Sequence, residues 1–380
     1  MHGLDEHGPC SLGTVWSDTE FIVPEKRWLH EAVSKIEADC RRTGETPMIH
    51  VELPASPGVA LYVKDETQHP TGSLQHRVAR SLFIYALCNG TITRGSTAVA
   101  SAVDPAVFAL AYFSRLIGLR FVAAIPDDFA ADQRARIEQF GGVCHRAEPD
   151  ARLADVAEKI AAESGGHVLD SGSSADNAIE WRREDSIAEA ILLNFDHDTA
   201  AAVRWIVGSA EESRTLSMLS RQASYRRLPT QIGAVIQPDM ATRLTPADRT
   251  LVIPADAGFA GNWFLEKCLR RRFDTNAGLN VWGTLSLIGE MVARGETGSV
   301  VCLVGEHADR PKIACVGTPL ETLARSCIDQ LDTFMRMGEW STPITPPTAV
   351  TYPVGRFRSH SFDAGISPAP LLDSLEEQTC

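Results

Sequence analysis

Residues 64–81 hold a group of side chains that could do chemistry at the start of a helix. The segment, KDETQHPTGSLQHRVARS, follows an apolar alternation at Val59, Leu61 and Val63 and runs into a helical pattern. It therefore predicts a strand, a glycine turn and a helix N-terminus, with Gln75 near the first helical turn. The amide nitrogen of Gln75 has no basic lone pair, so this side chain cannot form an imine with a carbonyl group.

Strands and helices alternate on both sides of this segment. The apolar patterns predict strands at 96–103, 121–126, 143–148, 167–170, 204–208, 231–237 and 299–305. They predict helices at 25–42, 77–88, 104–116 (with Asp104 as N-cap), 130–140, 151–164, 184–194, 212–225 and 278–294. This alternation indicates an α/β fold with parallel sheets that carry helices on both faces.

Length and composition limit the organisation of the chain. We expect two three-layer α/β subdomains with mainly parallel sheets, because 380 residues can bury a large core. We expect a mobile arm at 1–20 and an irregular tail at 341–380. Between them we expect a smaller subdomain at 48–172 and a larger subdomain built from 21–47 and 173–340.

The charge and the cysteines exclude several function classes. A formal net charge of -13 argues against nucleic acid or an anionic membrane as the main partner. Nine scattered cysteines without a Cys-x-x-Cys pair indicate a reducing compartment. The first ten residues lack the features of a signal peptide, and no apolar run is long enough to span a membrane. We therefore expect a cytoplasmic protein.

Several motifs resemble those of the fold-type II pyridoxal-phosphate (PLP) enzymes, in particular the cysteine synthase and bacterial cysteine desulfhydrase-like group. They are the segment 64–81 already quoted, ARSLFIYALCNG (79–90), AYFSRLIGL (111–119), the Phe-Gly-Gly turn (140–142), RWIVG (204–208) and NVWGTLSLIGEMVARGETGSVV (280–301). The resemblance covers roughly residues 20–340 and implies the tryptophan synthase β-like fold. A fold does not fix an activity, which depends on the residues of the site.

The first site element of the family is a lysine loop, roughly Asn/His-Pro-Thr-Gly-Ser-x-Lys-x-Arg, whose lysine forms the Schiff base with PLP. Gln75 stands at the lysine position. Lys64 is the only lysine nearby, and the family also has a lysine there, ahead of the loop. A displaced lysine stays open as the alternative.

The second element is a Ser/Thr-rich turn that binds the carboxylate of the amino-acid substrate at a helix N-terminus. The matching segment runs from Ser101 to Ala106 and contains Asp104 and Pro105. The resemblance places the Asp104 carboxylate where the substrate carboxylate would lie, and Pro105 removes one N–H donor. The similar string at 95–97 comes too early unless the loop has shifted.

The third element is a glycine-rich cup for the PLP phosphate, which follows a Trp-Ile-Val-type strand in the family. The residues at the matching positions here are Ser209, Ala210, Glu211, Glu212, Ser213, Arg214 and Thr215. The glycines are gone, and two carboxylates stand at the mouth. At a distance of about 4 Å and an effective dielectric constant near 20, the repulsion energy between each carboxylate and a phosphate charge would be about 4 kcal/mol.

The fourth element is a serine that contacts the pyridine nitrogen in the cysteine synthase group. His307 stands at that position, in the run Glu306–Arg310. An extra segment at 311–330 follows, in a pattern that predicts a strand or turn and then a helix.

Together the four changes predict a pseudoenzyme whose PLP site survives only as vestigial positions. We expect no catalytic residue, no bound metal and no PLP. Family members are usually dimers, so the resemblance implies a homodimer, or a heterodimer with an active homologue, in which the chain binds, scaffolds or regulates.

Two alternatives stay open. One is an enzyme without PLP that uses side chains of the emptied cleft, namely His76, Glu211, Glu212, Cys302, His307 and Asp309. The other is an active PLP-dependent enzyme of cysteine metabolism that catalyses β-elimination or β-replacement.

Overall fold

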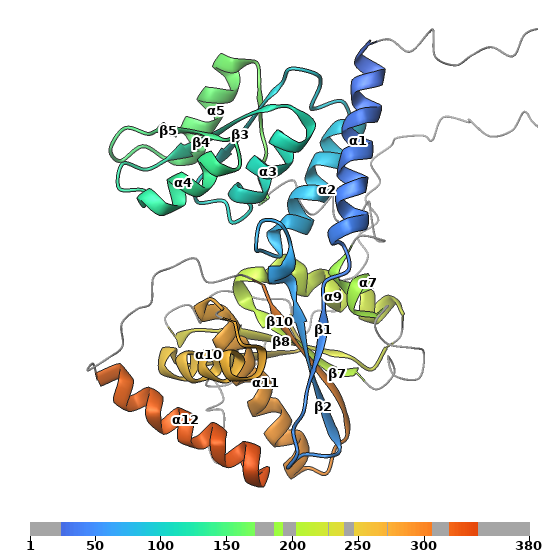
Figure 1. Ribbon diagram of the computed structural model, residues 1–380, viewed down its shortest axis with the longest axis vertical. Coiled ribbons are helices and arrows are strands. Elements are labelled where there is room, and N and C mark those ends of the chain that lie inside the picture. The colour runs from blue at the N-terminus through green and yellow to red at the C-terminus, as the bar shows by residue number, and fades with distance from the viewer. Residues whose placement is uncertain are drawn as a thin grey trace, which may run out of the picture. The chain divides into compact units, whose positions relative to one another are not determined.

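Two mainly parallel sheets organise the computed structural model, which describes residues 24–171, 186–192, 203–226, 228–238, 247–271, 273–305 and 319–340. One sheet has six strands in the order β1-β2-β10-β7-β8-β9, and the other has four in the order β5-β4-β3-β6 (Figure 1). The expected α/β fold with mainly parallel sheets is therefore confirmed.

The six-stranded sheet is parallel except at its edge, where β1 pairs antiparallel with β2. Its strands are β1 (Met48–Val51), β2 (Val59–Asp65), β7 (Val203–Ser209), β8 (Gln231–Ile236), β9 (Arg249–Val252) and β10 (Gly298–Val304). The central strand β10 is buried along almost its whole length because it lies inside the sheet and helices cover both of its faces. Such a strand has a continuous apolar sequence rather than an alternating one.

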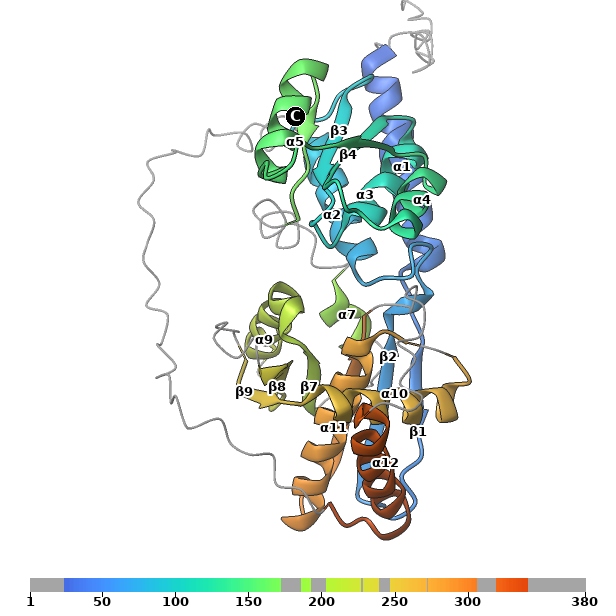
Figure 2. The ribbon, with the colours of Figure 1, turned by 90° about the vertical axis from the view of Figure 1, so that its left-hand side faces the viewer.

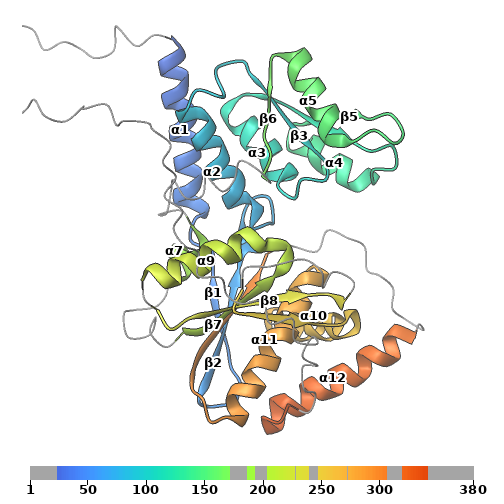
Figure 3. The same ribbon diagram turned by 180° about the vertical axis from the view of Figure 1, so that it is seen from behind.

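Helices cover both faces of the six-stranded sheet. They are α7 (Ile187–Leu192), α9 (Ser213–Tyr225), α10 (Ala255–Leu269), α11 (Thr275–Ala293) and α12 (Pro319–Met337). Val300, Cys302 and Val304 of β10 pack in the cluster that contains α10 and α11, whereas Val301 and Leu303 pack in the cluster that contains α7 and α9 (Figure 3). Successive side chains on a strand point to opposite faces, so β10 joins the two layers. Helix α12 packs against α10 (Figure 2).

The four-stranded sheet is parallel throughout. Its strands are β3 (Thr97–Ser101), β4 (Arg120–Ile125), β5 (Val143–Arg146) and β6 (His167–Val168), and the helices of this part are α1 (Pro24–Thr43), α2 (Gln75–Cys88), α3 (Val107–Ile117), α4 (Ala131–Gln139) and α5 (Leu153–Ser164). Ala98 and Ala100 of β3 face the core built with α1, α2 and α3, and Val99 faces α5.

The start of α3 differs from the prediction. The helix begins at Val107 with Ala106 as its N-cap, not at Asp104. The Asp104 carboxylate instead accepts a hydrogen bond from the Ala106 N–H at 2.7 Å, which closes the turn before the helix. Asp104 therefore shapes the approach to the helix rather than capping it.

Some expectations fall on residues outside the described part of the chain. They are the arm at 1–20, the tail at 341–380, residues 306–310 and the first part of the 311–330 segment, up to residue 318. The helix expected later in that segment is present as α12. The subdomain boundaries stay a prediction. None of the helices in the described ranges is long and apolar enough to cross a membrane.

Candidate functional site

The turn before α2 is tied to the end of β10. The Leu74 N–H donates to the Gly305 carbonyl at 2.7 Å. The turn contains Gly72 at a φ of 67°, a backbone conformation that favours glycine. Gln75 begins α2, and its backbone N–H donates to Ser73 Oγ at 3.1 Å. Gln75 and Gly305 thereby reach the same pocket.

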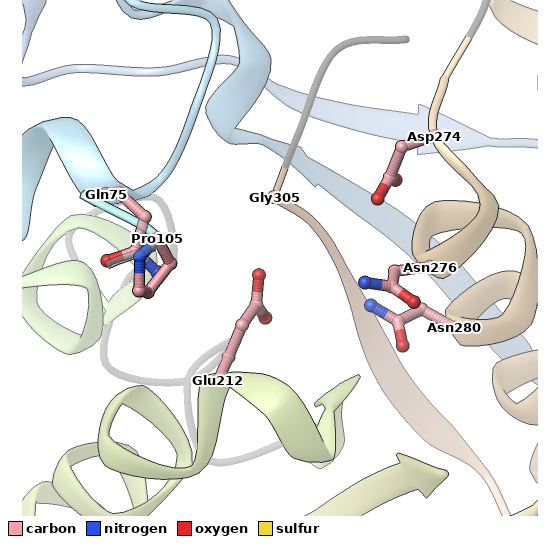
Figure 4. A pocket seen from close by; sticks show the side chains of 7 residues that line it. All are labelled: Gln75, Pro105, Glu212, Asp274, Asn276, Asn280 and Gly305. Atoms are coloured by element: carbon pink, nitrogen blue, oxygen red, sulfur yellow. The ribbon is translucent and has the colours of Figure 1, made fainter. Parts of the chain in front are cut away.

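This pocket is partly open to solvent and spans about 390 Å³, a volume that includes solvent outside the protein surface. Gln75, Pro105, Glu212, Asp274, Asn276, Asn280 and Gly305 line it. Two of these side chains are carboxylates and three are carboxamides, and Figure 4 shows them around a common space. No lysine, arginine or histidine of the described ranges belongs to the lining.

Glu212 enters the pocket from the loop that follows β7. A short 3-10 turn, η3 (Ala210–Glu212), connects the strand to α9, and Glu212 is the N-cap residue of that helix. Its carboxylate lies over the backbone of Gly305, where a Cβ would clash with Glu212 Oε1. The Glu212 carboxylate therefore fills the space next to the carboxyl end of β10.

Asp104 lies outside the pocket lining, although its neighbour Pro105 belongs to it. The Asp104 carboxylate accepts hydrogen bonds from the Ser171 N–H at 2.8 Å and from Ser171 Oγ at 2.6 Å. Burial raises the pKa of this carboxyl group. The hypothesis that its carboxylate occupies a former ligand position therefore has no support from its contacts, which are structural. Ser101, at the end of β3, is also absent from the lining.

The other positions matched to the phosphate cup contribute less. Ser209 and Thr215 are buried and do not line the pocket. The side chains of Glu211, Ser213 and Arg214, and all of His307 and Asp309, lie outside what the structure describes.

Lys64, the lysine of the displaced-lysine alternative, does not line the pocket. Its ammonium group is fully buried and donates to the Thr46 carbonyl at 2.8 Å and to the Ala190 carbonyl at 3.4 Å. Burial lowers its pKa to about 8. These contacts give Lys64 a structural role at the edge of β2.

Two candidates for PLP-independent catalysis also lie away from the pocket. Cys302 is fully buried in β10, and burial raises the pKa of its thiol to about 12, which makes it a poor nucleophile. His76 is fully buried and donates from Nε2 to Asp39 Oδ2 at 2.9 Å. Within the described ranges, no group of three or more His, Cys, Asp or Glu side chains could hold a metal ion.

A buried ionic network lies beside the start of α2. Glu66 accepts from Arg77 Nε at 2.6 Å and lies 2.9 Å from His69 Nε2. Burial alone would raise the pKa of Glu66, but Arg77 and His69 hold it well below its usual range. Charged groups are buried at low cost only when they are paired in this way. The network thus holds the strand, turn and helix together without reaching the pocket.

The sequence patterns did not point to Asp274, Asn276 and Asn280, which line the pocket from the start of α11. Asp274 is the N-cap of this helix, and its side chain accepts from the Ala277 N–H at 2.9 Å. Asn276 and Asn280 lie one turn apart on an otherwise mainly apolar helix. The sequence signal that could have identified them is the Asp-Thr-Asn run at the start of this helix, followed by one asparagine among apolar residues.

A family model described as "Pyridoxal-phosphate dependent enzyme" matches residues 41–251. The chain belongs to this family. It is 35% identical to the L-cysteine desulfhydrase Cds1 of Mycobacterium tuberculosis over 75% of this chain and 87% of that one. It is also 30% identical to cysteine synthase B of Pseudomonas aeruginosa over 37% of this chain and 48% of that one.

A solved structure supports the fold. The crystal structure of O-ureido-L-serine synthase matches with a TM-score of 0.63 and 19% identity, over 74% of this chain and 95% of that one. Its 35% identity to the L-cysteine desulfhydrase makes the chain a homologue of the PLP-dependent cysteine desulfhydrases and synthases, as its motifs predicted.

The residues of the pocket do not fit PLP. An imine needs an amine, and the lining contains only the amide of Gln75 at the turn. A phosphate needs N–H donors or cations; the described lining has carboxamide N–H groups but no cation, and it adds the carboxylates of Glu212 and Asp274. Glu212 also fills the space beside Gly305.

Proposed function

We propose that this chain is a non-catalytic member of the PLP-dependent family that binds a ligand or a partner without PLP. The observation that carries the proposal is the pocket lining, in which Gln75 stands where the motif has its lysine. An amide cannot anchor or release the cofactor covalently. The chain keeps the scaffold of the family, so the loss concerns the chemistry rather than the fold.

The charge of the pocket supports the same conclusion. Glu212 and Asp274 both belong to the lining. The repulsion energy between a carboxylate and a phosphate charge about 4 Å away is about 4 kcal/mol at an effective dielectric constant near 20. Two such groups would outweigh the contribution of a helix N-terminus, which is about 0.3–1 kcal/mol for a surface charge.

The proposal includes a role in an assembly, with a second copy of this chain or with an active homologue. Helix α12 belongs partly to the segment that is extra relative to the family motifs. Its Leu331 and Phe334 are buried in the core of the chain, whereas Arg325 and Arg336 are exposed. Light scattering on the purified protein, alone and mixed with a homologue that has the lysine, tests this role. A monomer under both conditions would contradict it.

Titration of the purified chain with PLP tests the proposal that the chain does not bind this cofactor covalently. We expect the spectrum to equal the sum of protein and free PLP, with no visible band from a protein-bound imine. A PLP-dependent homologue with the lysine serves as the positive control. A saturable visible band at one equivalent of PLP would contradict the proposal and favour an active enzyme.

A further inference from the structure

The C-terminal end of α1 is held by a buried carboxylate rather than by apolar packing. Ala32 and Ile36 are the fully buried apolar side chains of this helix. Beyond Ile36, Asp39 is the only buried residue of α1. Helices α1 and α2 lie side by side (Figure 1), and Asp39 faces the start of α2. The attachment of this end of the helix therefore depends on the partners of Asp39.

The partners of Asp39 come from three helices. His76 of α2 donates from Nε2 to Oδ2 at 2.9 Å, and the Tyr112 hydroxyl of α3 donates to Oδ1 at 2.8 Å. Arg42 of α1 donates to Oδ1 at 2.8 Å, and Arg80 of α2 lies 3.8 Å from Oδ2. One carboxylate thus joins α1 to both neighbouring helices.

A second carboxylate–imidazole pair lies beside the first. His69 Nε2 is 2.9 Å from Glu66, which begins the short 3-10 turn η1 (Glu66–Gln68), and both side chains are fully buried. The rings of His69 and His76 are stacked, with centroids 5.0 Å apart and an angle of 18° between their planes. Arg77 donates to Glu66 at 2.6 Å. The two imidazoles therefore share one closed site with guanidinium groups.

A proton on either ring would add a positive charge to this closed site. The charged and titratable groups around the two rings are Asp39 and Arg42 of α1, Lys64 of β2, Glu66 of η1, Arg77 and Arg80 of α2, and Tyr112 of α3. The cations outnumber the carboxylates in this set. Water that could stabilise a further charge is excluded, because both imidazoles are fully buried.

The native protein therefore holds both rings in their neutral form near pH 7. Burial lowers the pKa of His76 from 6.5 to about 4, and His69 and Arg80 add to this shift against the opposing effect of Asp39. Burial lowers the pKa of His69 as well, and Glu66 opposes that shift. A protonated His69 would also carry an N–H at Nδ1, which has no hydrogen-bond partner in the described part of the chain.

The same site fixes the backbone that leads to the pocket. Thr71 Oγ1 lies 3.2 Å from His76 Nδ1, and the Thr71 carbonyl accepts from Arg136 of α4 at 2.6 Å. Three residues later, the Leu74 N–H donates to the residue that follows β10, and Gln75 lines the pocket. A change in the stacked rings is therefore transmitted to the turn that positions Gln75.

We propose that His69 and His76 form a proton-operated switch: when the rings gain protons, segments 37–46 and 66–74 open while the two sheets stay folded. In the open state the imidazoles reach water and titrate near their usual pKa of 6.5, so acid favours opening between pH 6.5 and about pH 4. Opening also releases Gln75 from its place at the pocket. The inference goes beyond the proposed function and does not depend on it, because neither histidine lines the pocket.

Hydrogen–deuterium exchange of the full chain at pH 7 and pH 5, followed by peptide mass spectrometry, tests the proposal. The measured rates are divided by the intrinsic rates at each pH, so that only the protection of the amides is compared. Proton uptake by His76 alone should lower the protection of segments 37–46 and 66–74 about twentyfold. Amides of α11 and β10 should still be protected at pH 5 when these two segments have exchanged.

Two variants identify the groups responsible. His69→Gln/His76→Gln removes both titrating rings and keeps side chains that can donate to the two carboxylates, so protection of segments 37–46 and 66–74 should no longer depend on pH. His167→Gln removes an exposed imidazole from β6 and should show the loss seen in the wild type.

The wild-type measurement alone can overturn the proposal, even if the double variant does not fold. Equal protection of the two segments at pH 7 and pH 5 would overturn it. Exchange of these segments only together with α11 and β10 would overturn it as well, because the acid effect would then be global unfolding. A folded double variant that keeps the twentyfold loss would show that the two histidines are not the switch.

Discussion

The stability of the protein is expected to fall sharply between pH 7 and pH 5 because of His76. This imidazole is exposed to solvent in the unfolded chain and fully buried in the native one. Its neutral ring donates from Nε2 to Asp39 at 2.9 Å, and its Nδ1 lies 3.2 Å from Thr71 Oγ1, which can donate to it. Burial lowers its pKa from 6.5 to about 4, with His69 and Arg80 adding to the shift.

The direction and size of this change in the free energy of unfolding follow from proton linkage. Between pH 6.5 and pH 4 the unfolded state binds a proton that the native His76 does not, so acid favours unfolding. With these two pKa values, the free energy of unfolding drops by about 2 kcal/mol from pH 7 to pH 5. His69 acts in the same direction because burial lowers its pKa as well. Asp39 does not contribute in this range: burial alone would raise its pKa, but hydrogen bonds from His76 and Tyr112 hold that pKa below its usual value.

Urea unfolding at pH 7 and pH 5 measures this difference for the wild type and His76→Gln. Glutamine can donate to Asp39 but does not titrate, so the variant should lose about 2 kcal/mol less on acidification. His145→Gln, which removes an exposed imidazole from β5, is the matched control and should behave as the wild type does. Equal pH dependence of His76→Gln and the wild type would show that His76 does not cause the loss of stability.

Three further substitutions test the packing around the site, each by urea unfolding at pH 7. Gly305→Ala should cost less than the about 1–3 kcal/mol typical of overpacking, because its methyl group meets only the movable end of the Glu212 side chain, and it should cost still less in a Glu212→Ala background; equal cost in both backgrounds would contradict the close contact. Glu66→Gln should cost about 3–5 kcal/mol because it leaves Arg77 buried without its charge partner; a loss below about 1 kcal/mol would be too small for a buried pair. Asp104→Ala should cost about 1–3 kcal/mol through the loss of three hydrogen bonds, and Asp104→Asn less; an unchanged midpoint would show that these bonds do not stabilise the fold.

Much of the fold could be predicted because its strands are short apolar runs separated by helical periodicity. Elements with weak local signals were not predicted. Strand β1 has four residues and only one buried position, and its pairing with β2 depends on tertiary contacts. Helix α10 contains Gly258 and Gly261, which usually argue against a helix but here allow close packing against Gly278 of α11.

The site was harder to predict because its geometry depends on contacts far apart in the sequence. The motif identified Gln75 and Glu212, and both line the pocket. Asp104 was also selected, but Ser171, which accounts for its position, lies 67 residues away. Asn280 belongs to a helix whose sequence pattern indicates core packing, and only the fold shows that it meets the pocket.

Borohydride reduction followed by peptide mass spectrometry measures directly whether this chain anchors PLP. The protein is incubated with one equivalent of PLP, reduced, digested and analysed beside Gln75→Lys/Glu212→Gly, which restores an amine and removes the carboxylate over Gly305. We predict no stoichiometric pyridoxyl adduct on the wild-type chain and a gain of adduct at position 75 in the double variant. A single lysine of the wild-type chain modified to near completion would show that the chain does anchor PLP.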